Sequence, residues 1–493
     1  LFLSIISFCL LIGACGVVPS YAVDPVNYGQ TPLETVSTYP KPSQNRIQLT
    51  SYLIFHKSVY DTYKQFLAAH VDYLWFDQSS LSQAQPDGSY SFAQFYAALT
   101  ELKNLNSALK VGVHCGMIGM LGPYHVTYSY LSESDFLHDQ NNVRIANTSD
   151  PRVYYVNLGS STTRQKLVDA WKDIVNTKAP NLWGINFDGY QSYHLEPKFT
   201  QGCIEGPCNT KDYWYTNQKS LSQEINAALD QSREVTYNGV VQFLKPELTG
   251  YGVMNSEPLA YHDGVLVEHP HTMILSEKDF TEYMQVFDVL IPQQKKVIIW
   301  VQPKIISLQH PTFQFTNDLN LERFFLATYL LIQSNPYTYF GYNPATVYDG
   351  NNGVFFYKDW YLDYGAPVGS YTVANKLYIR QYAHGIAVVN PTTAPITYML
   401  PGGTYKRWGE TEVSGIQTLA PTSGVFFMKD TSVSLCPSDI NEDGITDTVD
   451  YSLFVIDFLK PVLSNPRSDI NGDGMADVAD YSKLAQNFLE VCQ

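Results

Sequence analysis

Residues 183–190 read WGINFDGY, a short apolar run that ends on the carboxylate of Asp188 and a Gly-Tyr pair. A run of this kind, too short for a helix and followed by a glycine, is typical of a buried strand that is followed by a turn. The strand it predicts is Leu182–Phe187. Seven further runs rich in β-branched and aromatic residues predict strands at Gln48–Phe55, Val71–Phe76, Lys110–His114, Glu234–Asn238, Gly264–Glu268, Lys296–Val301 and Tyr337–Phe340.

Helical patterns lie between several of these runs. They cover Phe92–Leu105, Thr163–Val175, Leu221–Ala228 and Glu322–Ile332. Eight strands that alternate with helices over about 300 residues predict an α/β fold, a parallel (β/α)8 or TIM barrel. A doubly wound open sheet is the alternative, but no glycine-rich phosphate turn follows the first strand.

Length and composition suggest further domains beside the barrel. The chain has 493 residues, and we assign 45–350 to the barrel. Residues 351–430 change to short alternating strands with Gly and Pro turns, which predicts a small antiparallel β-domain. Residues 436–493 form a separate module. The formal charge of −16 argues against nucleic acid as a partner, and 37 Tyr supply many flat amphipathic rings of the kind that sugars stack on.

The N-terminal segment 1–22 resembles an export leader. Leu1–Ala14 is one apolar run, too short for a membrane-spanning helix. Ile12–Cys15 resembles a bacterial lipobox, which would lipidate Cys15, whereas Ser20–Ala22 has the small residues that ordinary signal peptidase needs. We favour the lipoprotein site slightly, and expect a secreted protein or an outer-surface lipoprotein whose only membrane contact is that anchor.

Cysteine usage agrees with export, because disulfides persist in oxidising compartments. Cys203 and Cys208 lie close together in a polar loop and predict a local disulfide. Cys436 and Cys492 bracket the C-terminal module, and a bridge between them would tie its ends together. Cys115, on an apolar strand, is interpreted as a small buried hydrophobe.

Two matched acidic loops, thirty residues apart, dominate the C-terminal module. Each has oxygen side chains at loop positions 1, 3, 5, 9 and 12 and a glycine at position 6, the spacing that wraps Ca²⁺ in oxygen ligands. With the backbone carbonyl at position 7, the predicted ligands of two Ca²⁺ ions are Asp439, Asn441, Asp443, Ile445, Asp447 and Asp450, and Asp469, Asn471, Asp473, Met475, Asp477 and Asp480.

The segment 436–493 resembles a type I dockerin, whose loops also end in Asp at position 12. The resemblance implies an all-α module with one helix after each loop, and a cohesin-like domain of another protein as partner. The recognition residues of that family sit at loop positions 10 and 11, here Thr448-Val449 and Val478-Ala479. The best-known members have a Ser-Thr pair there, so this sequence departs from them.

Polar residues occupy the C-terminal ends of the predicted barrel strands, where barrel enzymes carry their chemistry. We interpret Asp188 and Glu268 as a catalytic pair. The residues expected to bind substrate around them are His56, Asp77, His114, Tyr190, Asn238, His269, Gln302 and Tyr342.

Glycoside hydrolysis uses two carboxyl groups, one that protonates the leaving oxygen and one that attacks or activates water. Asp188 has polar neighbours and suits the nucleophile or base, whereas Glu268 follows an apolar run that would hold it protonated. The structural alternatives are a simple Asp-Gly turn for Asp188 and an ion pair for Glu268, with Asp77 as the next acid. No HExxH spacing marks a catalytic metal, and no Gly-x-Ser-x-Gly elbow marks a serine hydrolase.

Several stretches carry a family resemblance: Phe187–Tyr190 at a strand end, Leu330–Tyr342, and, in the β-domain, Gly385–Thr392 and Gly402–Tyr405. On these, residues from about 45 to 430 resemble the glycosyl-hydrolase-like barrels of hypothetical family fifteen. The place of Asp188 is similar to that of the nucleophile in α-galactosidase-like barrels, which have the partner acid on the sixth strand.

These patterns together predict an exported glycoside hydrolase that acts on a poly- or oligosaccharide. We expect no cofactor for catalysis, and calcium-dependent docking to a cohesin-like protein; dockerins are carried mostly by polysaccharide-degrading enzymes. The alternative is a non-catalytic carbohydrate-binding protein or a structural component on a barrel scaffold.

Overall fold

The structure, a computed structural model, has two compact units, Leu1–Tyr361 and Leu362–Gln493. It describes residues 47–53, 57–77, 81–86, 89–115, 120–147, 151–187, 203–229, 233–238, 260–268, 270, 274, 276–301, 318–342, 357–429, 438–441, 445–460, 465–471 and 475–489. None of the helices in these ranges is long and apolar enough to cross a membrane.

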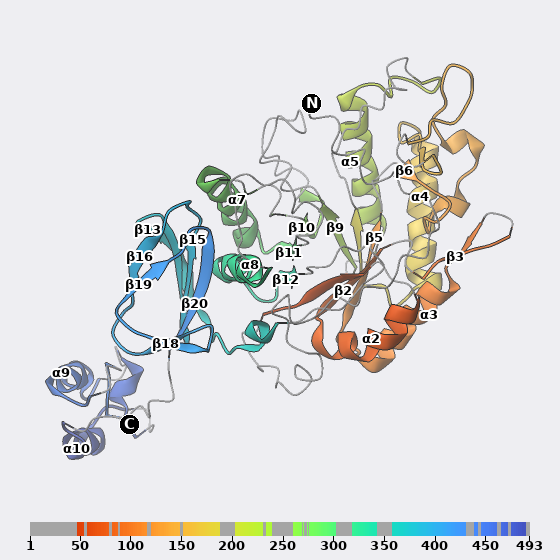
Figure 1. Cartoon of the computed structure of the whole chain (residues 1–493). Coiled ribbons are helices and arrows are strands. Elements are labelled where there is room, and N and C mark those ends of the chain that lie inside the picture. The colour runs from red at the N-terminus through yellow and green to blue at the C-terminus, as the bar shows by residue number, and fades with distance from the viewer. Residues whose placement is uncertain are drawn as a thin grey trace. The chain divides into compact units, whose positions relative to one another are not determined.

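The first unit contains an eight-stranded parallel sheet whose neighbours follow one another in chain order (Figure 1). Its strands are β1 (Thr50–Leu53), β2 (Tyr73–Asp77), β5 (Lys110–Cys115), β8 (Gly184–Phe187), β9 (Glu234–Asn238), β10 (Gly264–Glu268), β11 (Lys296–Val301) and β12 (Thr338–Tyr342). A parallel bridge between Leu49 and Phe340 brings the first strand to the last. The predicted barrel is therefore confirmed.

Helices follow most of these strands. They are α2 (Lys57–His70), α3 (Ala93–Leu105), α4 (Ser161–Asp173), α5 (Lys211–Ala228), α7 (Glu277–Leu290) and α8 (Asp318–Ile332). Helix α5 begins ten residues before the predicted Leu221–Ala228. Its cap is Thr210, whose side chain accepts a hydrogen bond from the backbone N–H of Tyr213. The first turns of α5 place three successive aromatic residues among polar ones, so they lack the apolar period on which the prediction rested.

The barrel interior is filled by large aromatic and aliphatic side chains. Tyr73, Trp75, Leu266, Ile298, Trp300 and Tyr339 form one buried cluster. Two glycines make room for the indoles, since a Cβ on Gly112 would lie 2.4 Å from the Trp75 ring and one on Gly341 would lie 2.3 Å from the Trp300 ring. Strand β12 thus continues through Gly341, past the predicted end at Phe340. The glycine at this position makes room for the Trp300 ring and does not form a turn.

The floor of the barrel, at the N-terminal ends of the strands, carries a charge cluster. Glu234 accepts from Lys110 at 3.1 Å, and the Lys296 ammonium lies 3.7 Å from the same oxygen. Lys110 also donates to the Tyr339 hydroxyl at 3.3 Å and lies over the Trp183 ring. Burial lowers the pKa of Lys296, while Glu234 opposes this shift. One buried carboxylate thus compensates two ammonium groups.

The end of the first unit is tied to α8. In the short helix η12 (Lys358–Tyr361), the Trp360 indole donates to Glu322 at 2.6 Å, and Arg323 donates to Asp359 at 2.7 Å. Burial, together with the Asp359 charge, raises the pKa of Glu322 well above its usual range. These contacts fix the last residues of the unit against the helix before β12.

The second unit begins with antiparallel sheets. The larger has the order β13-β14-β15-β20-β17-β18, and β16 pairs with β19. The strands are β13 (Pro367–Ala374), β14 (Leu377–Tyr382), β15 (Gly385–Asn390), β16 (Ile396–Met399), β17 (Tyr405–Arg407), β18 (Thr411–Val413), β19 (Ile416–Leu419) and β20 (Ser423–Lys429). The aromatic rings of Tyr364, Tyr382 and Phe426 pack together in the core of this part.

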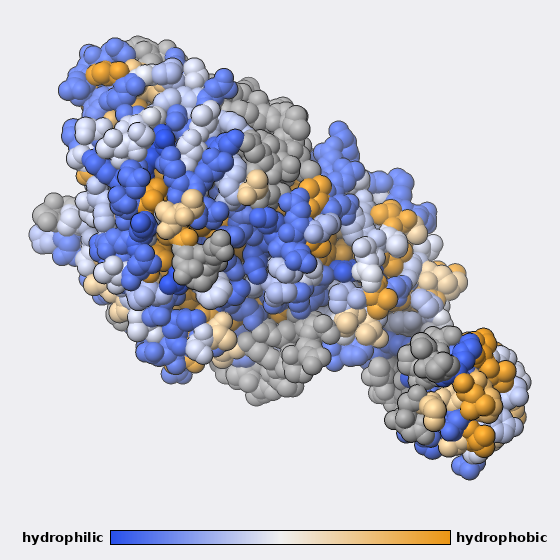
Figure 2. Space-filling model, turned by 180° about the vertical axis from the view of Figure 1, so that it is seen from behind, coloured by the Kyte–Doolittle hydropathy of each residue, from blue (hydrophilic) through white to orange (hydrophobic). Residues whose placement is uncertain are grey.

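Two short helices, α9 (Thr448–Asp457) and α10 (Val478–Gln486), form the C-terminal module around Ile440, Phe454, Ile470, Ala476 and Leu484. The repeats bond reciprocally, because Leu459 N–H donates to Ala476 at 2.8 Å and Leu489 N–H donates to Thr446 at 2.6 Å. Exposed apolar side chains also gather on this module (Figure 2), Val455 and Leu489 among them.

The floor cluster predicts an unequal response to one substitution. Glu234→Gln should lower the free energy of unfolding of the barrel by about 3 kcal/mol, because it leaves two ammonium groups facing each other without a counter-charge. Glu101→Gln, in the more exposed pair with Lys64, should cost less than about 1 kcal/mol. Urea unfolding followed by tryptophan fluorescence measures both. Equal costs for the two variants would contradict this role of Glu234.

Candidate active site

The strand ends of the barrel bring some of the predicted site residues into one region. Asp77, His114, Asn238, Glu268 and Tyr342 belong to the described residues. Five further predicted residues lie outside them: His56, Asp188, Tyr190, His269 and Gln302.

Strand alternation sets the direction of three of these side chains. Asp77 follows Tyr73 and Trp75 at intervals of two, and those two rings line the barrel interior. By the same alternation, Glu268 shares the inward face of Leu266, and Asn238 follows Thr236. Asp77, Asn238 and Glu268 are each the last residue of their strand, and each is only partly buried. On each of these three strands, the alternate residues that face the barrel interior thus end in a carboxylate or an amide at the C-terminal rim of the barrel.

Asn238 and Glu268 contact each other at the ends of adjacent strands. The Asn238 amide donates to Glu268 Oε2 at 2.6 Å, and β9 and β10 pair in parallel. A carboxyl group held by a donor on the neighbouring strand has a fixed orientation, which a general acid or base requires. A neutral amide is thus one partner of Glu268.

A buried polar chain crosses three strands beneath this rim. The ring nitrogen Nδ1 of His114 lies 2.8 Å from Asn186 Oδ1, and Asn186 Nδ2 donates to the Thr236 hydroxyl at 2.8 Å. His114 was predicted from its place at a strand end. Asn186 and Thr236 were not, although the alternation back from Asp188 and Asn238 puts them on the same face.

Tyr342 and Cys115 have other surroundings. The Tyr342 ring is buried and packs edge-on against Tyr357, with 5.6 Å between the ring centroids. It follows Gly341, which faces the interior, so Tyr342 lies on the other face of β12, a position that favours packing over substrate contact. Cys115 is buried and unbridged, and burial raises the pKa of its thiol, as a structural cysteine requires.

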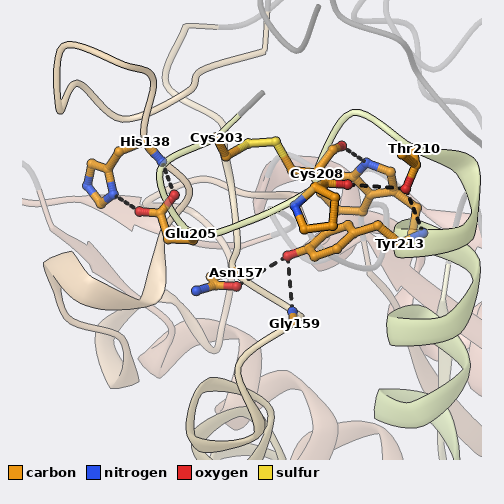
Figure 3. Close-up of a disulfide and its surroundings, with 10 residues drawn as sticks. His138, Asn157, Gly159, Cys203, Glu205, Cys208, Thr210 and Tyr213 are labelled. Carbon is orange, nitrogen blue, oxygen red and sulfur yellow. Dashed lines mark hydrogen bonds and ion pairs between the residues drawn. A yellow bond between two sulfur atoms is a disulfide. The ribbon is translucent and has the colours of Figure 1, made fainter. Parts of the chain in front are cut away.

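The predicted disulfide between Cys203 and Cys208 is present (Figure 3). It closes a small loop just before α5, and the carbonyl of Cys208 accepts from the Trp214 indole at 2.8 Å. The Tyr213 hydroxyl donates to Asn157 at 3.2 Å and accepts from the Gly159 N–H at 3.1 Å. The start of α5 is thereby fixed to the segment before α4. Cys436 and Cys492 lie outside the described residues.

His138 clamps this disulfide loop. Its Nδ1 lies 2.5 Å from Glu205 within the loop, and its Nε2 lies 2.9 Å from Glu133, as Figure 3 shows for the first contact. Arg144 in turn donates to Glu133 at 2.7 Å. Burial disfavours the imidazolium, but the hydrogen bonds to Glu133 and Glu205 outweigh it and raise the pKa of His138. Two carboxylate partners require both ring nitrogens to donate, hence a charged ring.

The predicted calcium ligands are described in part, since Asp443 and Asp473 lie outside the described residues. Asp450 Oδ1 accepts from the N–H groups of Ile440 and Asn441 at 2.6 and 2.9 Å, and Asp480 accepts from the N–H of Asn471 at 2.8 Å. In each loop, the carboxylate at position 12 is therefore hydrogen-bonded to the backbone at the beginning of the loop. Within the described ranges, no three His, Cys, Asp or Glu side chains gather as a metal site.

Residues 124–386 match the sequence profile described as Hypothetical glycosyl hydrolase family 15. A search of curated proteins found no match. Among solved structures, a maltogenic alpha-amylase, AmyB from Thermotoga neapolitana, has 8% identity and a TM-score of 0.46 over 78% of this chain and 99% of its own. An alpha-amylase from Lactobacillus plantarum has 14% identity and a TM-score of 0.46, with 78% and 98% covered. The GH36 alpha-galactosidase AgaA from Geobacillus stearothermophilus has 10% identity and a TM-score of 0.45, with 79% and 56% covered.

The clamp predicts a pH dependence of stability. A pKa raised above the ordinary value of 6.5 means that the contribution of His138 is complete below about pH 6.5 and is lost as the pH rises through the folded-state pKa. His138→Gln should therefore remove part of the fall in melting temperature between about pH 6 and pH 9. Calorimetry across that range measures the effect.

A matched control is His384→Gln, since His384 is an exposed imidazole beside Asp363. It should leave the pH dependence of the barrel transition unchanged. An unaltered profile in His138→Gln would show that the clamp contributes nothing.

Proposed function

The chain belongs to hypothetical glycosyl hydrolase family 15, and from this premise we propose that it cleaves a poly- or oligosaccharide with Asp188 and Glu268. It is a glycoside hydrolase of the barrel type. The observation that supports Glu268 most directly is the 2.6 Å bond from Asn238 at the C-terminal rim. It gives the carboxyl group a defined direction on the inward row of its strand.

The two carboxyl groups have different tasks in this proposal. Glu268 protonates the oxygen of the leaving sugar, and Asp188 attacks the anomeric carbon or activates water. Asp188 follows β8, which stands two strands from β10 in the barrel, with β9 between them. Asp77 ends a third inward row and is assigned to substrate hydroxyl groups, as are His114 and Asn238. His56, Tyr190, His269 and Gln302 are proposed to bind substrate from the sequence alone.

The C-terminal module is proposed to be a calcium-dependent dockerin that binds a cohesin-like protein. The repeated capping boxes at Asp447 and Asp477 support it, as do the reciprocal bonds between the repeats. The contacts of Asp450 and Asp480 support it further, because they draw each loop towards closure. Two Ca²⁺ ions would neutralise carboxylates that otherwise repel one another in each loop.

Export is proposed from the leader and the cysteines. The Cys203–Cys208 bridge supports an oxidising compartment, because such bridges persist outside the cytosol. Lipidation of Cys15 would anchor the protein at the outer surface of the cell, and cleavage after Ala22 would release it.

The catalytic pair predicts a specific loss of turnover. Asp188→Asn and Glu268→Gln should each lower kcat by about a thousandfold or more, because each removes the charge or the proton that the reaction needs. Binding of the oligosaccharide should be nearly unchanged, since the shape of each side chain is kept. Hydrolysis assays and isothermal titration calorimetry measure the two effects.

Glu224→Gln is the matched control, because Glu224 lies in an ion pair with Arg164 on the outside of the barrel, and it should retain activity. Full activity in Asp188→Asn or Glu268→Gln removes that residue from the mechanism. Binding without any hydrolysis by the parent protein would support the alternative of a carbohydrate-binding protein.

The calcium proposal predicts two binding events. Titration of the full chain should give a stoichiometry of two Ca²⁺, and Asp439→Ala and Asp469→Ala should each remove one of them. Asp363→Ala, which changes an exposed carboxylate outside the loops, is the control. If either loop variant still binds two Ca²⁺ ions, the assignment of that loop as a calcium site is wrong.

A further inference from the structure

We propose that Asn186 and Thr236 are positioning residues of the active site, which orient the His114 imidazole through its Nδ1 atom. The inference rests on the proposed function. To the proposed site it adds two buried residues, Asn186 and Thr236, which touch no substrate and act through His114.

The strand register brings the three side chains to one level. His114 pairs with Asn186 across β5 and β8, and Asn186 pairs with Thr236 across β8 and β9. His114 is 5% exposed, and the other two are fully buried. The bonds of 2.8 Å on either side of the Asn186 amide make one continuous chain. In a buried chain in which every polar group has a hydrogen-bond partner, each side chain is held in one orientation.

The direction of the hydrogen-bonded chain decides which ring nitrogen of His114 donates to Asn186. Asn186 donates from Nδ2 to the Thr236 hydroxyl, so its Oδ1 faces the ring and accepts from the Nδ1–H of His114. Orientation of the amide is assigned from this bonding pattern. Asn186 is neutral, so it does not repay the cost of burying an imidazolium, as a carboxylate in its place would.

A charged side chain, that of Asp77, ends the strand next to His114. Asp77 on β2 is the register partner of His114, and Asp188 lies two residues beyond Asn186 in the sequence. Of the three strands that carry the hydrogen-bonded chain, β8 and β9 contribute the uncharged Asn186 and Thr236 at the level of His114. The partner of His114 Nδ1 is thus a neutral amide.

A purely structural role would be served better by apolar residues. The barrel interior is otherwise filled by side chains such as Trp75, Leu266 and Ile298, and a polar chain among them is stabilising only while all its bonds are made. Asn186 stands two residues before Asp188, and Thr236 stands two residues before Asn238. Thr236 thus lies directly beneath Asn238, one of the proposed site residues.

Asn186→Asp is the decisive variant, because it keeps the shape and adds a charge beside the ring. The pH midpoint of His114, measured by hydrogen exchange of the ring carbon proton with mass spectrometry, should rise by at least about one unit relative to the parent protein. The acidic limb of the kcat/KM profile should move upward by the same amount.

Thr236→Val tests the other end of the chain and does not depend on the folding of Asn186→Asp. It removes the acceptor that orients the amide, and kcat should fall about tenfold with little change in KM. Thr236→Ser keeps the hydroxyl and should restore the rate. Thr50→Val is the matched control, since Thr50 is also a buried barrel threonine but bonds to the Tyr73 carbonyl; it should leave kcat and the pH profile unchanged.

An unchanged His114 midpoint in Asn186→Asp would overturn the inference. A shifted midpoint with an unchanged pH profile would also overturn it, because His114 would then be held but would play no part in the reaction. If the parent protein hydrolyses no glycan, the proposed function fails, and the exchange midpoint alone still decides whether Asn186 is coupled to His114.

Discussion

In a closed barrel of parallel strands, every second side chain of each strand must fit inside a space that is fixed by the number of strands. This constraint organises the first unit of the protein. At the floor, the interior position of each of three strands is charged, and Glu234 compensates Lys110 and Lys296. Along the strands, Trp75 and Trp300 fill the interior beside Gly112 and Gly341. The rows end at the C-terminal rim, where Asp77, Asn238 and Glu268 face the same side as the core.

The division between a packed floor and a polar rim explains how the proposed glycoside hydrolase site is built. The apolar and ion-paired levels supply rigidity, since they leave few alternative arrangements. The rim supplies carboxyl groups whose directions follow from neighbouring strands, as the Asn238–Glu268 bond illustrates. Between the two, the chain from His114 to Thr236 is polar and yet buried. It joins the scaffold to the chemistry that we propose for the rim.

Much of this arrangement follows from sequence patterns. The eight strand signals predict the barrel, and the cysteine spacing in the 203–208 loop predicts its disulfide. Alternation along a strand also predicts which strand-end residues face inward, but only when the strand ends are known. Tyr342 illustrates the limit, because β12 runs two residues beyond the predicted strand and its alternation puts that ring against Tyr357. Contacts between distant segments, such as Glu234 with Lys110 or His138 with Glu205, depend on tertiary packing that one sequence does not encode as a local pattern.

The most direct measurement of the central claim is product analysis after incubation of the purified chain with a panel of oligo- and polysaccharides in water enriched in ¹⁸O. A glycoside hydrolase transfers the oxygen of water to the anomeric carbon that it releases. Our account predicts that at least one glycan is shortened and that the new reducing end carries one ¹⁸O. Glycans that bind to the protein but remain intact, across the whole panel, would contradict it.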